Sequence, residues 1–158
     1  MYGGASVGLM GVVADAALAH GAHVIGVLPD FLAGKEIAHE GLSEMHIVPS
    51  MHARKLAMAD RADAFVALPG GFGTLEELFE VVTWAQLGLH TKPCGLLNAA
   101  GFYDPLLAFL DRAVAQELVK AVHRDLVISA GSAAVLLDRL STHRPVLTVP
   151  KWIGAPET

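Results

Sequence analysis

The run PGGFGTLEE, from Pro69 to Glu77, contains three glycines and a threonine and connects two apolar segments of the chain. The apolar residues 64–68 predict a buried strand, and residues 75–87 place apolar side chains at helical spacing. Glycines let backbone amides approach a ligand closely, and the amino end of a helix favours an anion. The run therefore predicts a phosphate site, and we place the carboxylates of Glu76 and Glu77 beside it in the first helical turn.

The same residues also fit a purely structural interpretation. Thr74 and Glu77 match a capping box, in which the threonine caps the helix and the glutamate bonds back to the cap amide. A capping box needs no ligand, but it does not explain the preceding glycines, which lose much conformational entropy on folding. We therefore favour phosphate binding by the backbone of residues 71–74 over capping alone.

A second glycine-rich turn lies at residues 2–11 and leads into an alanine-rich helix. It contains no dinucleotide-binding GxGxxG and no Walker loop, since Leu9 follows Gly8 where lysine is required. Gly4, Ser6 and Gly8 match the GxSxG nucleophile elbow, but the chain is short for an α/β hydrolase and no later Asp and His pair stands out. We favour a second backbone nest for the ligand at Gly4, with Ser6 as a hydroxyl donor.

The composition sets the broad class. A chain of 158 residues, of which 53% are hydrophobic, fills one core. We expect a single domain over residues 1–143 and an irregular tail over residues 144–158. The sequence shows no apolar stretch of transmembrane length and no signal peptide, which predicts a cytoplasmic protein without a membrane partner. The net charge of −5 argues against a nucleic-acid partner, and Cys94 is expected to be a buried small hydrophobe.

The residue pattern predicts neither a metal nor a cofactor. The eight histidines form no HExxH motif, and His39 with Glu40 lacks a second histidine. A lysine decarboxylase would need a pyridoxal phosphate site with a Schiff-base lysine, and the main glycine run contains no lysine.

Strands and helices alternate along the chain. Strands are predicted at residues 1–2, 23–28, 45–48, 64–68, 93–98 and 126–129, and helices up to residue 20 and at residues 50–59, 75–87, 104–117 and 133–140. This alternation with short connections requires right-handed crossovers and a mostly parallel sheet. We therefore expect an α/β fold, a Rossmann-like doubly wound sheet with helices on both faces and its ligand at the carboxyl ends of the strands.

The chain begins at the last residues of a predicted strand, directly before a glycine loop. Such folds normally open with a complete βα unit of roughly 30 residues, which supplies a central strand. We expect a misassigned start or a truncated chain.

Arg54 and Lys55 lie on a helix that Ser50 is expected to cap. Adjacent basic residues on a helix usually face solvent. A parallel-sheet crossover also brings this helix to the edge that holds the main glycine run, where Arg54 would contact the phosphate or the Glu77 carboxylate. The residues alone leave both interpretations open. If Arg54 contacts the phosphate or Glu77, we expect Arg54, Glu77 and the amides of residues 71–74 to converge on one pocket.

Residues 51–93 resemble the signature region of the LOG family, the cytokinin-activating nucleoside monophosphate phosphoribohydrolases that are often mislabelled lysine decarboxylases. The PGGxGTxxE and RK motifs stand at the expected separation, and the segments VIGVLP, GLLNAAGFYD and GASVGLMG also match. The resemblance extends to about Leu140, while the family's first strand and its CGSS turn are absent.

The resemblance implies hydrolysis of the N-glycosidic bond of an N6-substituted adenosine 5′-monophosphate, which releases the free base and ribose 5-phosphate. It implies that Arg54 and Glu77 are the essential pair. The implied substrate-binding positions are Glu36, Lys55, Gly71, Phe72, Gly73, Thr74, Leu75, Glu76 and Thr83. A carboxylate under the ribose stabilises positive charge or activates water, which suits Glu77, and Arg54 orients Glu77 or supports the departing base.

Two other functions are weighed against this one. A nucleotide-binding module without turnover would follow from the short amino end. A dinucleotide oxidoreductase is disfavoured, because Glu76 stands where the third glycine of GxGxxG belongs.

A homodimer is implied by the resemblance and supported by the helix at residues 75–88. This helix carries Phe79, Trp84 and Leu87 in addition to the apolar stripe that its own core needs. We expect Trp84 and Leu87 to pack against a twofold mate, with Thr83 near the boundary.

Overall fold

The computed structural model describes residues 1–33 and 37–145. It divides the chain into two compact units, Met1–Ala62 and Asp63–Thr158, which are described separately below. Glu36 and most of the expected tail lie outside the described residues. The expectation of a single domain over residues 1–143 stays a prediction.

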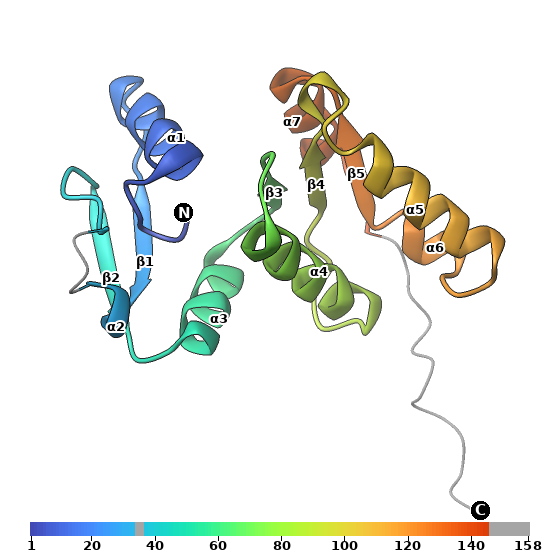
Figure 1. Ribbon diagram of the computed structural model, residues 1–158, viewed down its shortest axis with the longest axis horizontal. Coiled ribbons are helices and arrows are strands. Elements are labelled where there is room, and N and C mark those ends of the chain that lie inside the picture. Colours follow the sequence, from blue (N-terminus) through green and yellow to red (C-terminus); the bar gives the residue numbers. More distant parts are fainter. Residues whose placement is uncertain (34–36, 146–158) are drawn as a thin grey trace, which may run out of the picture. The chain divides into compact units, whose positions relative to one another are not determined.

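Unit 1 is built on parallel strands (Figure 1). Strands β1 (Ile25–Pro29) and β2 (Glu44–Val48) pair in parallel, and Tyr2 bridges β1 at Gly26 on the other side. The predicted strand remnant at residues 1–2 is therefore confirmed as a bridge. The helices of this unit are α1 (Gly8–Ala19), α2 (Asp30–Ala33) and α3 (Met51–Arg61).

Unit 2 contains a three-stranded parallel sheet. Its order is β3-β4-β5, formed by β3 (Phe65–Ala67), β4 (Cys94–Leu97) and β5 (Val127–Ala130). The helical elements are α4 (Phe72–Gln86), η1 (Ala99–Gly101), α5 (Asp104–Ala115), α6 (Ala121–Arg124) and α7 (Ala133–Ser141).

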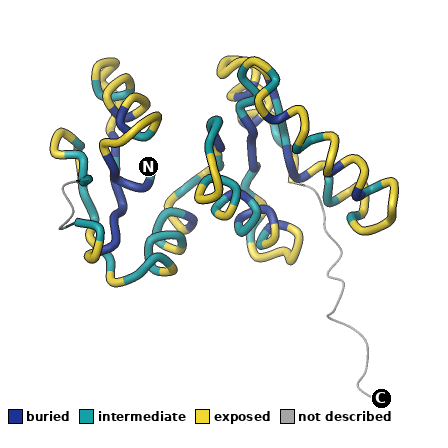
Figure 2. The backbone as a smooth tube through the Cα atoms, in the orientation of Figure 1, coloured by how far each residue is buried: buried dark blue, intermediate teal, exposed yellow. Residues whose placement is uncertain are grey.

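Helices cover both faces of the unit 2 sheet, because successive residues of β4 point to opposite sides. Cys94 and Leu96 join a core cluster with residues of α4 and α5. Leu97 packs against the cluster that contains Leu136 of α7, and a side chain at Gly95 would also meet α7. The backbone of β4 is accordingly buried (Figure 2). The predicted α/β class with parallel strands between helices is confirmed.

The free thiol of the chain lies in the centre of this sheet. Cys94 is 1% exposed, and burial raises the pKa of its thiol to about 12. The expectation of a buried small hydrophobe is confirmed.

Most predicted elements are present within a few residues of their expected bounds. The clearest error is the start of α4, which begins at Phe72 instead of Leu75. The short helices α2 and α6 were not predicted, because four residues carry too little periodicity to signal a helix. Among the described residues, no helix is both long and apolar enough to cross a bilayer.

His90 ties the turn after α4 back to that helix. Its Nε2 lies 2.8 Å from the Val81 carbonyl, and its Nδ1 lies 3.1 Å from the Lys92 amide. A neutral ring satisfies both contacts, with Nε2 donating to the carbonyl and Nδ1 accepting from the amide. Burial lowers the pKa of the His90 imidazole, against the opposing effect of the Val81 carbonyl.

This geometry predicts an acid-sensitive contribution to stability. Because the folded-state pKa of His90 lies below the unfolded value of 6.5, its contribution is complete above about pH 6.5 and is lost as pH falls through the folded pKa. We expect His90→Gln to flatten the fall in unfolding free energy between pH 7.5 and 5, measured by urea denaturation. The matched control is His52→Gln, at an exposed histidine of α3. An identical pH dependence in wild type and His90→Gln would contradict the assignment.

Candidate functional site

The main glycine run forms the connection from β3 to α4 at the carboxyl end of the strand. Gly71 is the N-cap residue of α4, and because it has no side chain it makes no cap hydrogen bond to the first-turn amides. The first-turn amides of an α-helix have no partner within the helix, so they point out from its amino end. This arrangement is suited to an anion.

The capping-box interpretation is wrong. Thr74 is the third residue of α4, so it lies inside the helix and is not its cap. Glu76 and Glu77 are correspondingly in the second turn, not the first as we expected. The error has a local cause, because Thr74 is a strong cap residue by type, whereas the N-cap position of α4 is occupied by Gly71.

The glycines of the run differ in whether the surrounding structure leaves room for a side chain. A side chain at Gly70 would collide with the Thr74 hydroxyl, which folds back over it. A methyl group at Gly71 or at Gly73 would meet no atom of the described chain within 4 Å. Packing within the described chain therefore explains Gly70 but not Gly71 or Gly73.

The other predicted residues on α4 differ in their availability. Phe72 is 94% exposed and Glu76 is exposed, while Glu77 is half-buried. Leu75 packs against the core of unit 2, so it would contact a ligand only through its backbone. The Thr83 hydroxyl donates to the Phe79 carbonyl at 2.6 Å. Thr83 is eleven residues beyond Phe72, about 16 Å along the helix axis, and its role stays a prediction.

The first glycine turn lies in unit 1 before α1. Gly4 adopts φ 74, a conformation that glycine favours, and its carbonyl accepts a 2.9 Å hydrogen bond from the His39 amide. The Ser6 amide and hydroxyl both donate to the Ile37 carbonyl, at 2.8 and 3.3 Å. The N-cap residue of α1 is Val7, whose side chain makes no cap hydrogen bond. Like α4, helix α1 therefore begins just after a glycine turn without a capping side chain at its N-cap position.

Arg54 lies against the first glycine turn. Ser50 caps α3 as predicted, accepting a 3.1 Å hydrogen bond from the Ala53 amide. Arg54 follows one turn later and is half-buried, and a side chain at Gly3 would meet its Nη1 at 3.2 Å. Lys55 is half-buried as well. Arg54 is therefore not a purely solvated residue, and its role in the site stays a prediction.

The predicted site residues thus form two groups. Arg54, Gly4 and Ser6 belong to unit 1, whereas residues 71–77 belong to unit 2. Their convergence on one pocket stays a prediction. The proximity of Arg54 to Gly3 was missed, because a contact across 51 positions leaves no periodic signal in the sequence.

The chain is similar to proteins of one family. A family model described as possible lysine decarboxylase matches residues 10–140. The probable cytokinin riboside 5'-monophosphate phosphoribohydrolase LOGL9 of Oryza sativa subsp. japonica is 56% identical over 92% of the chain and 64% of its own length. The cytokinin riboside 5'-monophosphate phosphoribohydrolase LOG2 of Arabidopsis thaliana is 52% identical over 92% of the chain and 68% of its own length.

The chain belongs to the LOG family. The resemblance seen in the sequence is thereby confirmed. This LOG-family chain spans about two thirds of the length of the curated relatives it matches.

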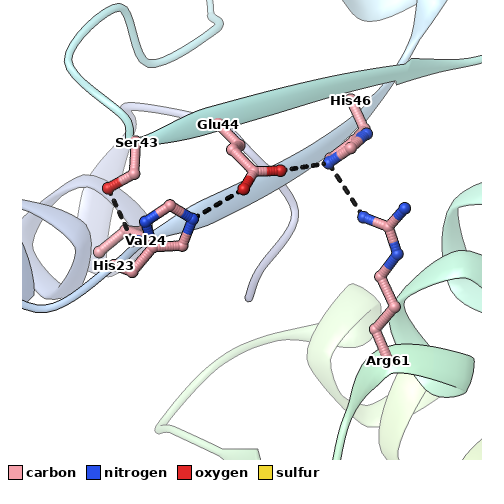
Figure 3. Close-up of polar contacts among 6 residues, drawn as sticks. All are labelled: His23, Val24, Ser43, Glu44, His46 and Arg61. Carbon is pink, nitrogen blue, oxygen red and sulfur yellow. Dashed lines mark hydrogen bonds and ion pairs between the residues drawn. The ribbon is translucent and has the colours of Figure 1, made fainter.

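A polar network that sequence reasoning missed lies at the amino ends of β1 and β2 (Figure 3). The Glu44 carboxylate bridges two histidines, with Oε1 at 2.8 Å from His23 Nε2 and Oε2 at 3.0 Å from His46 Nε2. Arg61 Nη1 lies 2.9 Å from the same His46 nitrogen. Hydrogen bonds from the two histidines hold the pKa of Glu44 below its usual value.

This network does not belong to the candidate site of the LOG-family chain. Within unit 1 it lies at the amino end of β1, whereas the first glycine turn follows the Tyr2 bridge toward the carboxyl end of that strand, and its residues are exposed or half-buried. The His46 nitrogen cannot both donate to Glu44 and accept from Arg61, so only one of these two contacts is a hydrogen bond at a time. In the described ranges, no group of three or more His, Cys, Asp or Glu is arranged to hold a metal ion.

Proposed function

We propose that this protein hydrolyses the N-glycosidic bond of N6-substituted adenosine 5′-monophosphates, releasing the free base and ribose 5-phosphate. The names of its relatives support the substrate class. The observation that carries the proposal is the amino end of α4, where the N-cap residue Gly71 offers no capping side chain and where packing in the described chain requires neither Gly71 nor Gly73. Such an end binds the phosphate of a nucleotide through backbone amides.

Phosphate binding places the sugar for bond cleavage. A phosphate held by the amides of residues 71–74 leaves the ribose near the following turn of α4, which carries Glu77. The breaking bond makes the sugar oxocarbenium-like, so the Glu77 carboxylate stabilises positive charge or activates water. Binding energy from the phosphate is thereby used to orient the reacting atoms.

Residues of unit 1 complete the proposal. We assign Arg54 to orienting Glu77 or to supporting the departing base, and Lys55 to a phosphate contact. Gly4 and Ser6 supply a second nest, in which the Ser6 hydroxyl exchanges its 3.3 Å bond to the Ile37 carbonyl for a bond to the ligand. Glu36, which lies outside the described residues, binds a ribose hydroxyl or the base. We keep the cytoplasm as the proposed site of action.

The test is release of free base from a panel of adenosine 5′-monophosphates with and without N6 substituents. We expect release from the monophosphates and at least about a hundredfold slower release from the matching nucleosides, because phosphate binding energy is missing there. Circular dichroism on the same sample shows that the protein is folded. Binding of monophosphates by folded protein without base release would support the binding-module alternative instead.

We further propose that the protein is a homodimer through the carboxyl end of α4. Trp84 is half-buried against the core of unit 2, so only part of its side chain is available to a twofold mate. Leu87 is 53% exposed and Leu89 is 70% exposed. The exposed apolar surface proposed for the dimer contact therefore lies just beyond the carboxyl end of α4. An isologous contact between two such ends would cover both leucines.

Light scattering tests the dimer. We expect twice the monomer mass at micromolar concentration, and a monomer for Leu87→Lys, because a buried lysine without a partner opposes association. The control is Leu118→Lys, at an exposed leucine after α5. A monomeric wild type would refute the proposal, and a broad distribution of masses would indicate non-specific association.

A further inference from the structure

A buried tyrosine holds the glycine run from the interior of unit 2. Tyr103 is 2% exposed, and its hydroxyl donates a 2.5 Å hydrogen bond to the Leu68 carbonyl. Burial raises the pKa of this phenol, and the Gly70 backbone opposes that rise, which places Gly70 close to the same oxygen. One phenol oxygen therefore contacts the chain on both sides of Pro69, where β3 passes into the run.

The turn that carries Tyr103 is itself fixed by Asn98, which follows β4. The Asn98 Oδ1 accepts from the Tyr103 amide at 2.7 Å, and its Nδ2 donates to Asp104 Oδ1 at 2.7 Å. The Asn98 amide donates to the Ala130 carbonyl of β5 at 2.8 Å. The phenol is thus anchored to the sheet by a continuous set of hydrogen bonds.

The backbone of this turn is unusual. Ala100 has φ 51 and Gly101 has φ 73, which places both in the left-handed region. A non-glycine residue rarely adopts this conformation, and such residues concentrate where the surrounding structure must hold a functional group in place. The turn ends at Tyr103, the N-cap residue of α5, which does not cap that helix with its side chain in the described structure. The Tyr103 hydroxyl instead donates to the Leu68 carbonyl, at the start of the glycine run.

We propose that Tyr103 is a positioning residue for phosphate binding, whose hydroxyl fixes the backbone from Leu68 to Gly70 so that the amides of residues 71–74 are oriented before the ligand arrives. A run with three glycines samples many conformations unless it is held, and ordering it during binding would weaken affinity. The inference rests on the proposed function in one respect, that the ligand is a 5′-phosphate.

Packing alone does not account for the hydroxyl. The ring of Tyr103 meets that of Phe102 edge to face, with centroids 4.9 Å apart, and joins the core cluster of unit 2. Phenylalanine would keep both contacts. Tyr103→Phe therefore removes the hydrogen bonds to the run and leaves the core filled.

Hydrogen exchange followed by mass spectrometry tests the positioning without a ligand. In Tyr103→Phe we expect amides of residues 70–74 to exchange at least about tenfold faster, with β4, β5 and α5 unchanged, because a lost hydrogen bond frees the run locally. Thr142→Val is the matched control, since it removes a hydroxyl that donates to the Asp138 carbonyl at 2.9 Å at the end of α7. Asn98→Ala is expected to act in the same direction through the turn.

Kinetics and binding supply the second readout. We expect Tyr103→Phe to raise KM for the monophosphate about fivefold to tenfold with kcat within about threefold, and to weaken ribose 5-phosphate binding in calorimetry to a similar extent. Unchanged exchange at residues 70–74, or a uniform rise across unit 2, would overturn the positioning role. A wild type that releases no base would overturn the proposed function, while exchange and ribose 5-phosphate binding would still decide the role of Tyr103.

Discussion

Glu77→Gln is expected to lower kcat for base release by at least about a thousandfold, which corresponds to roughly 4 kcal/mol of transition-state stabilisation. The substitution keeps the shape and removes the charge. Because that charge acts on the oxocarbenium-like sugar and not on the bound ground state, we expect Kd for the monophosphate to stay within about tenfold. Single-turnover kinetics and calorimetry on the same protein measure the two quantities.

Two further variants separate the roles around Glu77. Arg54→Ala is expected to weaken both binding and turnover, since either proposed role of Arg54 places it against the substrate. Glu117→Gln makes the same chemical change at an exposed carboxylate beyond α5 and should behave as wild type. Ordinary turnover in Glu77→Gln would remove Glu77 from the mechanism.

Gly73→Ala is expected to make the protein more stable and a poorer binder. Gly73 is an exposed residue of α4, and alanine there would meet no atom of the described chain within 4 Å. Alanine is favoured over glycine in a helix by about 0.8 to 1 kcal/mol. We expect unfolding free energy to rise by up to about that amount, while affinity for the monophosphate falls at least about tenfold because the methyl group obstructs the approach of phosphate to the amides.

Gly70→Ala is the contrasting variant. Its methyl group would collide with the Thr74 hydroxyl, so we expect loss of stability as well as of binding. Urea denaturation and calorimetry on both variants give the comparison. Unchanged monophosphate affinity in Gly73→Ala would show that the phosphate is not bound at this helix end.

Local patterns in the sequence predicted what depends on neighbouring residues. The strand before Pro69, the Ser50 cap and the burial of Cys94 all follow from residue type and spacing. The start of α4 was missed by three residues, because Thr74 has the chemistry of a cap but its hydroxyl lies over Gly70 instead.

Contacts between residues far apart in the chain could not be predicted from the sequence. Arg54 meets the first glycine turn across 51 positions, and Tyr103 bonds to Leu68 across 35. Neither pair repeats with a helical or strand period, so only the fold brings them together. The roles of Glu36 and Thr83 come from family resemblance and stay predictions.

The buried thiol makes this chain well suited to site-directed labelling. With its pKa raised to about 12, Cys94 stays a protonated thiol near neutral pH and offers almost no thiolate to a maleimide. A second cysteine introduced at the surface will therefore react selectively, without first replacing the native one. At Phe72, which is 94% exposed beside the glycine run, an attached fluorophore would report ligand arrival in real time.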